Sequence, residues 1–172
     1  MFGPSVTSLF DNTVAVIPVS DINSEIAQTN EIFPEASIVQ VEPERHDRLM
    51  SLILSLPYLV NLALAGTIMD EDLELLRKLS GTSFALQYTL IQSVAAENTN
   101  LVYALLSENR FLGESSEKLI ENLTKIKEKI GSIEEFSQMH EEIRSSMRQD
   151  IVYIKAHQIR QVAYDIIRPV LR

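Results

Sequence analysis

The feature that most constrains this chain is the regular spacing of apolar residues between Ser132 and Pro169. Apolar side chains recur there every three or four residues, which is the period of an amphipathic helix. Ser132 and Glu135 match a capping box at its start, and Pro169 is placed to end it. The stripes are Phe136, Met139, Ile143, Met147, Ile151 and Ile154, and beside them Val152, Ala156, Ile159, Ala163 and Ile166. The sequence therefore predicts one unusually long helix.

A long helix with two apolar stripes usually packs on two sides. One stripe can face the chain's own core while the other faces a second subunit. We therefore expect a homodimer through the C-terminal helices. The alternative is that both stripes serve a single internal core.

The rest of the chain after Pro43 also reads as helix. The whole chain has only five Gly and six Pro, and such sparse breakers favour helices over a turn-rich sandwich or barrel. A helix is expected from Pro43 with a bend at Pro57. Further helices are expected over residues 70–78, 83–96, 100–108 and 116–130, the last closed by Gly131.

The beginning of the chain has a different pattern. The β-branched run at 13–19 and the run at 36–41 read as strands, and Asp21 can cap a helix between them that ends before Pro34. Such a βαβ unit needs further strands to be stable. We therefore expect residues 1–42 to be a residual piece of a larger sheet, and residues 43–172 to form a helical domain.

Composition excludes several classes of function. The chain has no Cys, which rules out disulfides, thiolate metal sites, iron–sulfur clusters and a cysteine nucleophile. A net charge of −9 repels nucleic acid and anionic lipid. The N-terminus does not resemble a signal peptide, and the apolar run from Leu49 to Met69 is interrupted by polar residues, Pro57 and Gly66. We expect a cytoplasmic protein that binds neither nucleic acid nor membrane.

Few residues are placed to carry chemistry. No glycine fingerprint follows a strand, and no phosphate-binding loop is present. His46, His140 and His157 are too far apart in sequence for a paired-histidine metal site, so no metal is expected. His46 and Asp47 directly follow a predicted strand, where ligands bind in α/β folds. The alternative is that Asp47 only stabilises the helix start and His46 is solvated.

Several short motifs, taken in order, resemble those of prephenate dehydrogenases, especially of archaeal type. Met1-Phe2-Gly3-Pro4 resembles the end of a His-Pro-Met-Phe-Gly-Pro motif, and Glu44-Arg45-His46-Asp47-Arg48 resembles a Glu-x-His-Asp-Arg segment. Gly81-Thr82-Ser83-Phe84 resembles a glycine-rich turn with its Phe. Residues 98–101 and 107–110 resemble Asn-Pro-Glu-Leu and Glu-Asn elements. By motif, the resemblance extends to about Arg110.

The resemblance implies a mainly α fold. It would be a helical bundle like the C-terminal domain of 6-phosphogluconate dehydrogenases, preceded by a short βαβ unit from the end of a nucleotide-binding domain. The implied activity is NAD(P)-dependent oxidative decarboxylation of prephenate to 4-hydroxyphenylpyruvate, on the route to tyrosine. The family's catalytic His would lie just before Met1 and its nucleotide-binding glycines further upstream. We therefore expect no catalytic residue in this chain, no activity from it alone, and NAD or NADP only with an upstream or separate domain.

Site residues follow from the same motifs. The resemblance marks Gly3, His46 and Asp47 as lining the site for a prephenate-like molecule, with Ser83 and Gln87 as weaker candidates on the expected substrate face. Many family members have a carboxylate-binding Arg where this chain has Thr89. Gln92 or Arg160 would have to replace it, from the same or the other subunit.

Two other functions remain open at this point. The chain could be a non-catalytic helical dimerisation or regulatory module that has lost its chemistry. It could also be a helical chorismate mutase, which would need several inward Arg and Lys for a dicarboxylate. The stretch from Ser83 to Asn109 contains neither residue type, which counts against that second alternative.

Overall fold

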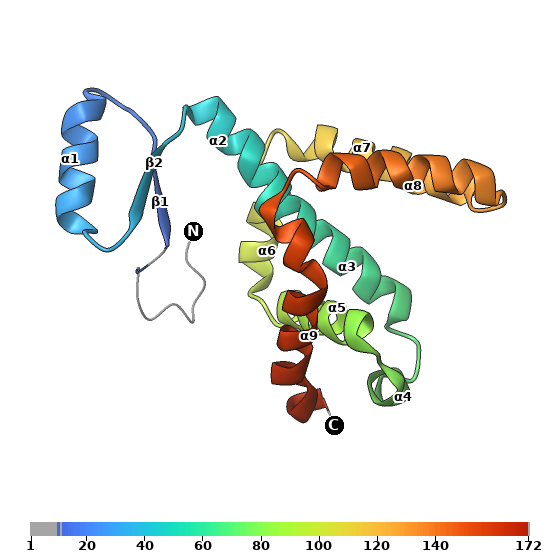
Figure 1. Cartoon of the computed structure of the whole chain (residues 1–172). Helices are drawn as coiled ribbons and strands as arrows, with labels where there is room; N and C mark the ends of the chain where they lie inside the picture. Colours follow the sequence, from blue (N-terminus) through green and yellow to red (C-terminus); the bar gives the residue numbers. More distant parts are fainter. Residues whose placement is uncertain (1–9, 11, 172) are drawn as a thin grey trace.

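The computed structural model describes residue 10 and residues 12–171, and its fold is mainly α-helical with a small parallel sheet (Figure 1). The sheet belongs to a βαβ unit of β1 (Thr13–Val16), α1 (Ile22–Ile32) and β2 (Ser37–Gln40). The two strands are parallel, with Thr13 opposite Ser37 and Val16 opposite Gln40. The predicted order is confirmed, although both strands are shorter than expected.

A long helical rod joins this unit to the rest. It consists of α2 (Pro43–Met50), a π-helical turn η1 (Ser51–Ser55) and α3 (Leu56–Ile68). The N–H of Leu56 donates to the Ser51 carbonyl, five residues back, which defines the π turn. The turn stands directly before Pro57, whose ring crowds the carbonyl of residue 53 and whose nitrogen cannot donate. The irregularity expected at Pro57 therefore takes the form of a widened turn.

Helix α5 is the centre of the helical part. After α4 (Leu73–Leu79), α5 (Thr82–Ala95) packs against α3, and α6 (Thr99–Ser107) follows it. The buried side chains of α5 are Ala85, Tyr88, Ile91 and Val94. Their spacing of three places them along one face of the helix. This face provides most of the buried apolar side chains in the described part of the chain.

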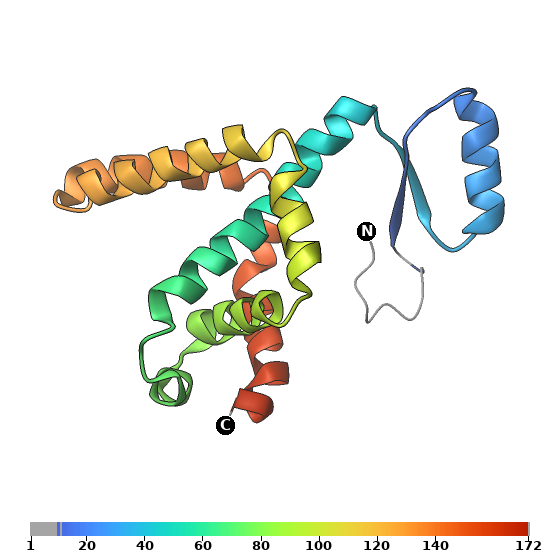
Figure 2. The same cartoon turned by 180° about the vertical axis from the view of Figure 1, so that it is seen from behind.

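Helices α7 (Leu112–Lys129) and α8 (Ile133–Met147) form an antiparallel hairpin that extends away from α5 in both views (Figures 1 and 2). The start of α7 packs on η1, where the hydroxyls of the buried Ser51 and the half-buried Ser115 lie 2.6 Å apart. Helix α7 begins about one turn before the expected residue 116. At the start of α8, the Ser132 hydroxyl accepts the N–H of Glu135 at 3.3 Å, as the capping box predicts.

The sequence predicts a single long C-terminal helix. This prediction is wrong, because the structure has two helices there. A turn at 148–150 separates α8 from α9 (Ile151–Leu171). Asp150 stabilises this break, since its N–H donates to the Met147 carbonyl and its carboxylate accepts the N–H of Val152 at 2.7 Å. The two helices pack on different elements, α8 on α7 and α9 on α5. The chain changes direction between α8 and α9, which allows α8 to pack on α7 and α9 to pack on α5.

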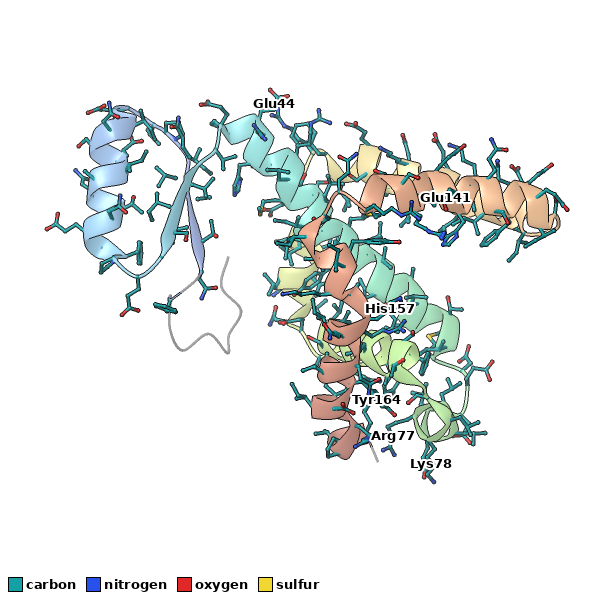
Figure 3. The ribbon with its side chains drawn as sticks, viewed as in Figure 1. Glu44, Arg77, Lys78, Glu141, His157 and Tyr164 are labelled. Carbon is teal, nitrogen blue, oxygen red and sulfur yellow. The ribbon has the colours of Figure 1, made fainter. Side chains whose placement is uncertain are left out.

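Pro169 does not end the last helix, contrary to expectation, because α9 continues to Leu171. It lies in the last turn, where only one backbone hydrogen bond is lost. Arg77 of α4 donates to the Leu171 carbonyl, which ties this end of α9 to α4. Figure 3 shows Arg77 beside the C-terminal end of α9, with Tyr164 and His157 further along the same helix.

The rod from Pro43 to Ile68 is long and apolar enough to cross a membrane by length and composition alone. Core helices of soluble proteins, which are mostly buried, can pass the same test, whereas 17% of the apolar window in this rod is buried within the single chain. The rod also carries buried polar side chains that bond to neighbouring elements. Asn61 accepts from Gln87 of α5 at 2.7 Å, and Ser51 bonds to Ser115 of α7. These contacts fit a helix that packs in protein, and the absence of a membrane partner stays a prediction.

Candidate binding pocket

The first wall of the candidate pocket is the beginning of α2. Pro43 occupies the first turn of this helix and Glu44 places a negative charge there, both of which favour a helix start. His46 and Asp47 follow in the next turn, and the His46 Nδ1 lies 3.2 Å from Asp47 Oδ1. The His46 side chain is 26% exposed, so its ring is accessible.

The second wall is the corner between α6 and α7. Asn109 holds this corner against α2, because its side-chain amide donates to the Asp47 carbonyl at 2.9 Å. The Asn109 Oδ1 in turn accepts the N–H of Phe111 at 2.9 Å. Two segments that are 62 residues apart in sequence therefore meet at one hydrogen-bonded junction. One is the His46-Asp47 motif, and the other is the Glu108-Asn109-Arg110 motif.

A pocket of about 350 Å³ lies between these walls. That volume is within the range for small-molecule sites. Its apolar lining comes from Met50, Leu54, Ala104 and Leu105, and its polar lining from His46, Asp47, Ser55, Glu108, Asn109 and Arg110. The combination of an apolar surface with a few convergent polar groups is typical of a binding site for a small organic molecule.

Two arginines near the pocket are held by one aromatic ring. The guanidinium carbons of Arg48 and Arg110 lie 4.5 Å and 4.8 Å from the centre of the Phe111 ring. Arg48 also forms an ion pair with Glu114, at 2.9 Å. Within residues 12–171, Arg110 has no such ion pair. Of these two cations, Arg110 is therefore the one available to a ligand.

The predicted site residues fall into separate places. His46 and Asp47 line the pocket, whereas Ser83 and Gln87 lie on α5 and do not. The Gln87 amide donates to Asn61 at 2.7 Å, and Asn61 donates to the Pro57 carbonyl at 2.8 Å. Gln87 thus joins α5 to α3. Gly3 lies outside the described residues.

Arg160 reaches the start of α5 from within the same chain. Its guanidinium donates to the Ser83 hydroxyl at 3.2 Å and lies 3.3 Å from the His157 Nδ1. Thr89 bonds instead to its own helix, donating to the Ala85 carbonyl at 2.9 Å. Among the residues suggested to replace an Arg at position 89, Arg160 is therefore placed beside another predicted site residue, Ser83.

Sequence reasoning named three pocket residues only as part of a motif and not as site residues. They are Glu108, Asn109 and Arg110, which line the pocket opposite His46. A local signal existed, because a polar run between two helical stretches marks a helix junction. Nothing local could indicate that this junction packs on α2. Nowhere in the described part of the chain do three or more His, Asp or Glu gather as metal ligands.

Comparison with known proteins gives two matches. A family model described as "Prephenate dehydrogenase, dimerization domain" matches residues 42–149, which include both walls of the pocket. The chain is also 25% identical over 135 residues to a Methanocaldococcus jannaschii protein named "Probable arogenate/prephenate dehydrogenase". That match covers 74% of this chain and 30% of the relative, so the chain spans less than a third of the relative's length.

Proposed function

The chain belongs to the prephenate dehydrogenase dimerization-domain family, and on that basis we propose that it is the helical, substrate-binding and dimer-forming part of a prephenate dehydrogenase. The observation that carries this proposal is the pocket. It is built entirely from the segment that the family model matches, and it combines an apolar surface with convergent charged side chains. The reaction would be oxidative decarboxylation of prephenate or arogenate on the cytoplasmic route to tyrosine.

This chemistry needs parts that the present residues do not supply. Hydride transfer requires a bound nicotinamide and a positioned group that polarises the substrate hydroxyl. The sequence has no dinucleotide-binding glycine fingerprint. We therefore propose that a nucleotide-binding domain, upstream or on a separate chain, brings NAD or NADP and the catalytic histidine. The present chain would bind the substrate and be inactive alone.

The βαβ unit supports such an arrangement. Within the residues that the structure describes, its sheet has two strands, although a stable sheet normally has more strands or further cover. Val39 of β2 is 45% exposed. Additional strands of a nucleotide-binding sheet would extend this pair and cover such side chains. Residues up to 42 would then belong to that domain, and the helical domain would begin at Pro43.

Helix α9 supports dimer formation. It has no buried residue in the single chain. Its exposed apolar side chains are Ile151, Val152, Tyr153, Ile154, Ile159, Val162, Ile166 and Val170. A continuous group of exposed apolar side chains on one helix usually marks a surface that another protein covers. A second copy of the chain is the partner that we propose.

Reconstitution tests the proposed function. The chain would be incubated with prephenate or arogenate and NAD or NADP, with and without the nucleotide-binding domain of a related dehydrogenase, while nicotinamide reduction is followed. We expect turnover only when both proteins are present. Turnover by the chain alone would contradict the proposal of an inactive part. If neither substrate binds the chain or is consumed by the pair, the chain is instead a non-catalytic dimerisation module.

A further inference from the structure

One buried hydroxyl belongs to the wall of the candidate pocket. Ser55 of η1 lines the pocket and is 2% exposed, which makes it the most buried of the described residues that surround it. Among the described residues its hydroxyl has no hydrogen-bond partner, whereas every fully enclosed side-chain polar atom has one. The Ser55 hydroxyl is therefore not enclosed, and the space open to it is the pocket that Ser55 lines.

The π-helical turn explains why this hydroxyl is free. In an α-helix, a Ser or Thr hydroxyl commonly donates to the carbonyl four residues back. Four threonines in the other helices do so at 2.7–2.9 Å, namely Thr29, Thr67, Thr89 and Thr124. The corresponding acceptor for Ser55 is the Ser51 carbonyl, but in η1 that carbonyl pairs with the N–H of Leu56, one residue further on. The turn thus moves Ser55 away from its usual acceptor and leaves its hydroxyl to the pocket.

The polar character of the pocket changes from its open side to its buried side. The ionisable residues of its lining are half-buried or exposed, and they are His46, Asp47, Glu108 and Arg110. Ser55 is buried and uncharged. Because burial of a charge costs far more than burial of a hydroxyl that finds a partner, a ligand would keep its charged groups near solvent. Together with the apolar lining, this suits a ring that enters with an uncharged oxygen first.

We infer that Ser55 is a ligand-binding residue whose hydroxyl forms a hydrogen bond with the ring hydroxyl of the substrate. A serine hydroxyl can both donate and accept, so it pairs with another hydroxyl without a charge on either side. Its position is set by burial, because the side chain has a single torsion between heavy atoms. The inference rests on the proposed function and adds the residue that holds the hydroxyl which the reaction requires to be polarised.

Binding of two keto acids that differ by one hydroxyl tests this inference. The product of the proposed reaction, 4-hydroxyphenylpyruvate, carries the ring hydroxyl and phenylpyruvate lacks it, while both carry the same charge. We expect the full chain to bind 4-hydroxyphenylpyruvate about fivefold tighter or more in calorimetric titration, since a site built for a hydroxyl discriminates against the ligand without one. Ser55→Ala should weaken the binding of 4-hydroxyphenylpyruvate until both ligands bind alike, and should leave the binding of phenylpyruvate unchanged.

The matched control is Ser51→Ala, which removes a buried hydroxyl from the same turn but one that bonds to Ser115 and does not line the pocket. It should lower the melting temperature and keep the preference for 4-hydroxyphenylpyruvate. Ser55→Ala should do the opposite and maintain the melting temperature, because no protein group loses a hydrogen bond.

Equal affinity of the unaltered chain for the two ligands, or a preference that survives in Ser55→Ala, would overturn the inference while the proposed function stands. If neither ligand binds the unaltered chain, the proposed substrate-binding function is wrong as well.

Discussion

Glu25 shows how one side chain fixes the entry of the chain into a helix. Its carboxylate accepts the backbone N–H of Ser20 at 2.8 Å and that of Val19 at 3.2 Å, both before the start of α1. The Ser20 hydroxyl also donates to it, at 3.1 Å. These donors stabilise the charged form, so the pKa of Glu25 is lowered, chiefly by the Ser20 N–H.

The lowered pKa predicts a specific pH dependence. Because the folded pKa is below the ordinary glutamate value of 4.5, the unfolded state binds the proton more tightly. The stabilisation is therefore present above pH 4.5 and is lost as the pH falls through the folded pKa. We expect Glu25→Gln to destabilise the protein at neutral pH and the difference to shrink in acid. Urea unfolding at several pH values would measure this, and a pH-independent difference would contradict it.

The hydroxyl pair of the buried Ser51 and the half-buried Ser115 gives a second prediction at this scale. Ser51 is 0% exposed and lies 2.6 Å from Ser115, so removal of one hydroxyl leaves the other without its partner. We expect Ser51→Ala to lower the free energy of unfolding by about 1–3 kcal/mol. The double variant with Ser115→Ala should cost less than the sum of the single variants. The exposed Ser93→Ala is the control, and additive single effects would refute the coupling.

At the scale of elements, η1 sets the register between α2 and α3. A π-helical turn contains one residue more than an α-helical turn. The preceding helix α2 is therefore rotated about the helix axis relative to α3. In this register Arg48 reaches Glu114 and the Asp47 carbonyl reaches Asn109. The π turn therefore positions the pocket wall, although none of its own residues forms these two contacts.

Deletion of Ile53 tests that role. Without the extra residue the turn should become α-helical and rotate α2 by about 100° relative to α3. We expect loss of ligand binding and at least about 2 kcal/mol of stability, because the hydrogen bonds of Ser51 and Asp47 would be broken. Ile53→Ala is the matched control, since this side chain is 64% exposed and its truncation should cost little. Retained binding in the deletion variant would exclude the proposed role.

The break between α8 and α9 depends on Asp150. We expect Asp150→Ala to destabilise the protein by about 1 kcal/mol, the usual cost of a lost N-terminal cap. Asp150→Asn should retain most of the stability, because its side-chain oxygen can still accept the Val152 N–H. Thermal unfolding of the two variants would measure the difference. An equal loss in both would mean that the carboxylate charge, and not the cap, stabilises the break.

At the scale of the whole molecule, the exposed face of α9 predicts how copies associate. Val162 and Ile166 lie one turn apart and are 60% and 71% exposed. We expect the double substitution Val162→Glu and Ile166→Glu to weaken the proposed dimer about tenfold or more, because it places charges in the apolar surface proposed as its interface. Sedimentation equilibrium would show the mass approach the 19.4 kDa of one chain. Ile32→Glu, at a similarly exposed position on α1, should leave the dimer intact.

The sequence by itself determined which stretches are helices and that a βαβ unit comes first. These properties are local, because the apolar period, Asp21, Pro43 and Ser132 act within a few residues of their own position. The strand followed directly by a helix left His46 and Asp47 open, either as pocket residues or as a helix start with a solvated histidine. The resemblance to the family marked them as site residues. Local reasoning failed for the region after Met147, where the period continues through a turn that Asp150 makes possible.

Only the tertiary structure decided which of these local features meet. Asn109 bonds to α2 across 62 residues of sequence, and this places Arg110 on the Phe111 ring beside the pocket, without an ion pair among the described residues. Gln87 was also predicted as a site residue from its position on α5. Its side-chain amide instead donates to Asn61 of α3. Helical period specifies which side of a helix is apolar. The neighbour that covers that side depends on packing between elements far apart in sequence, which no local pattern contains.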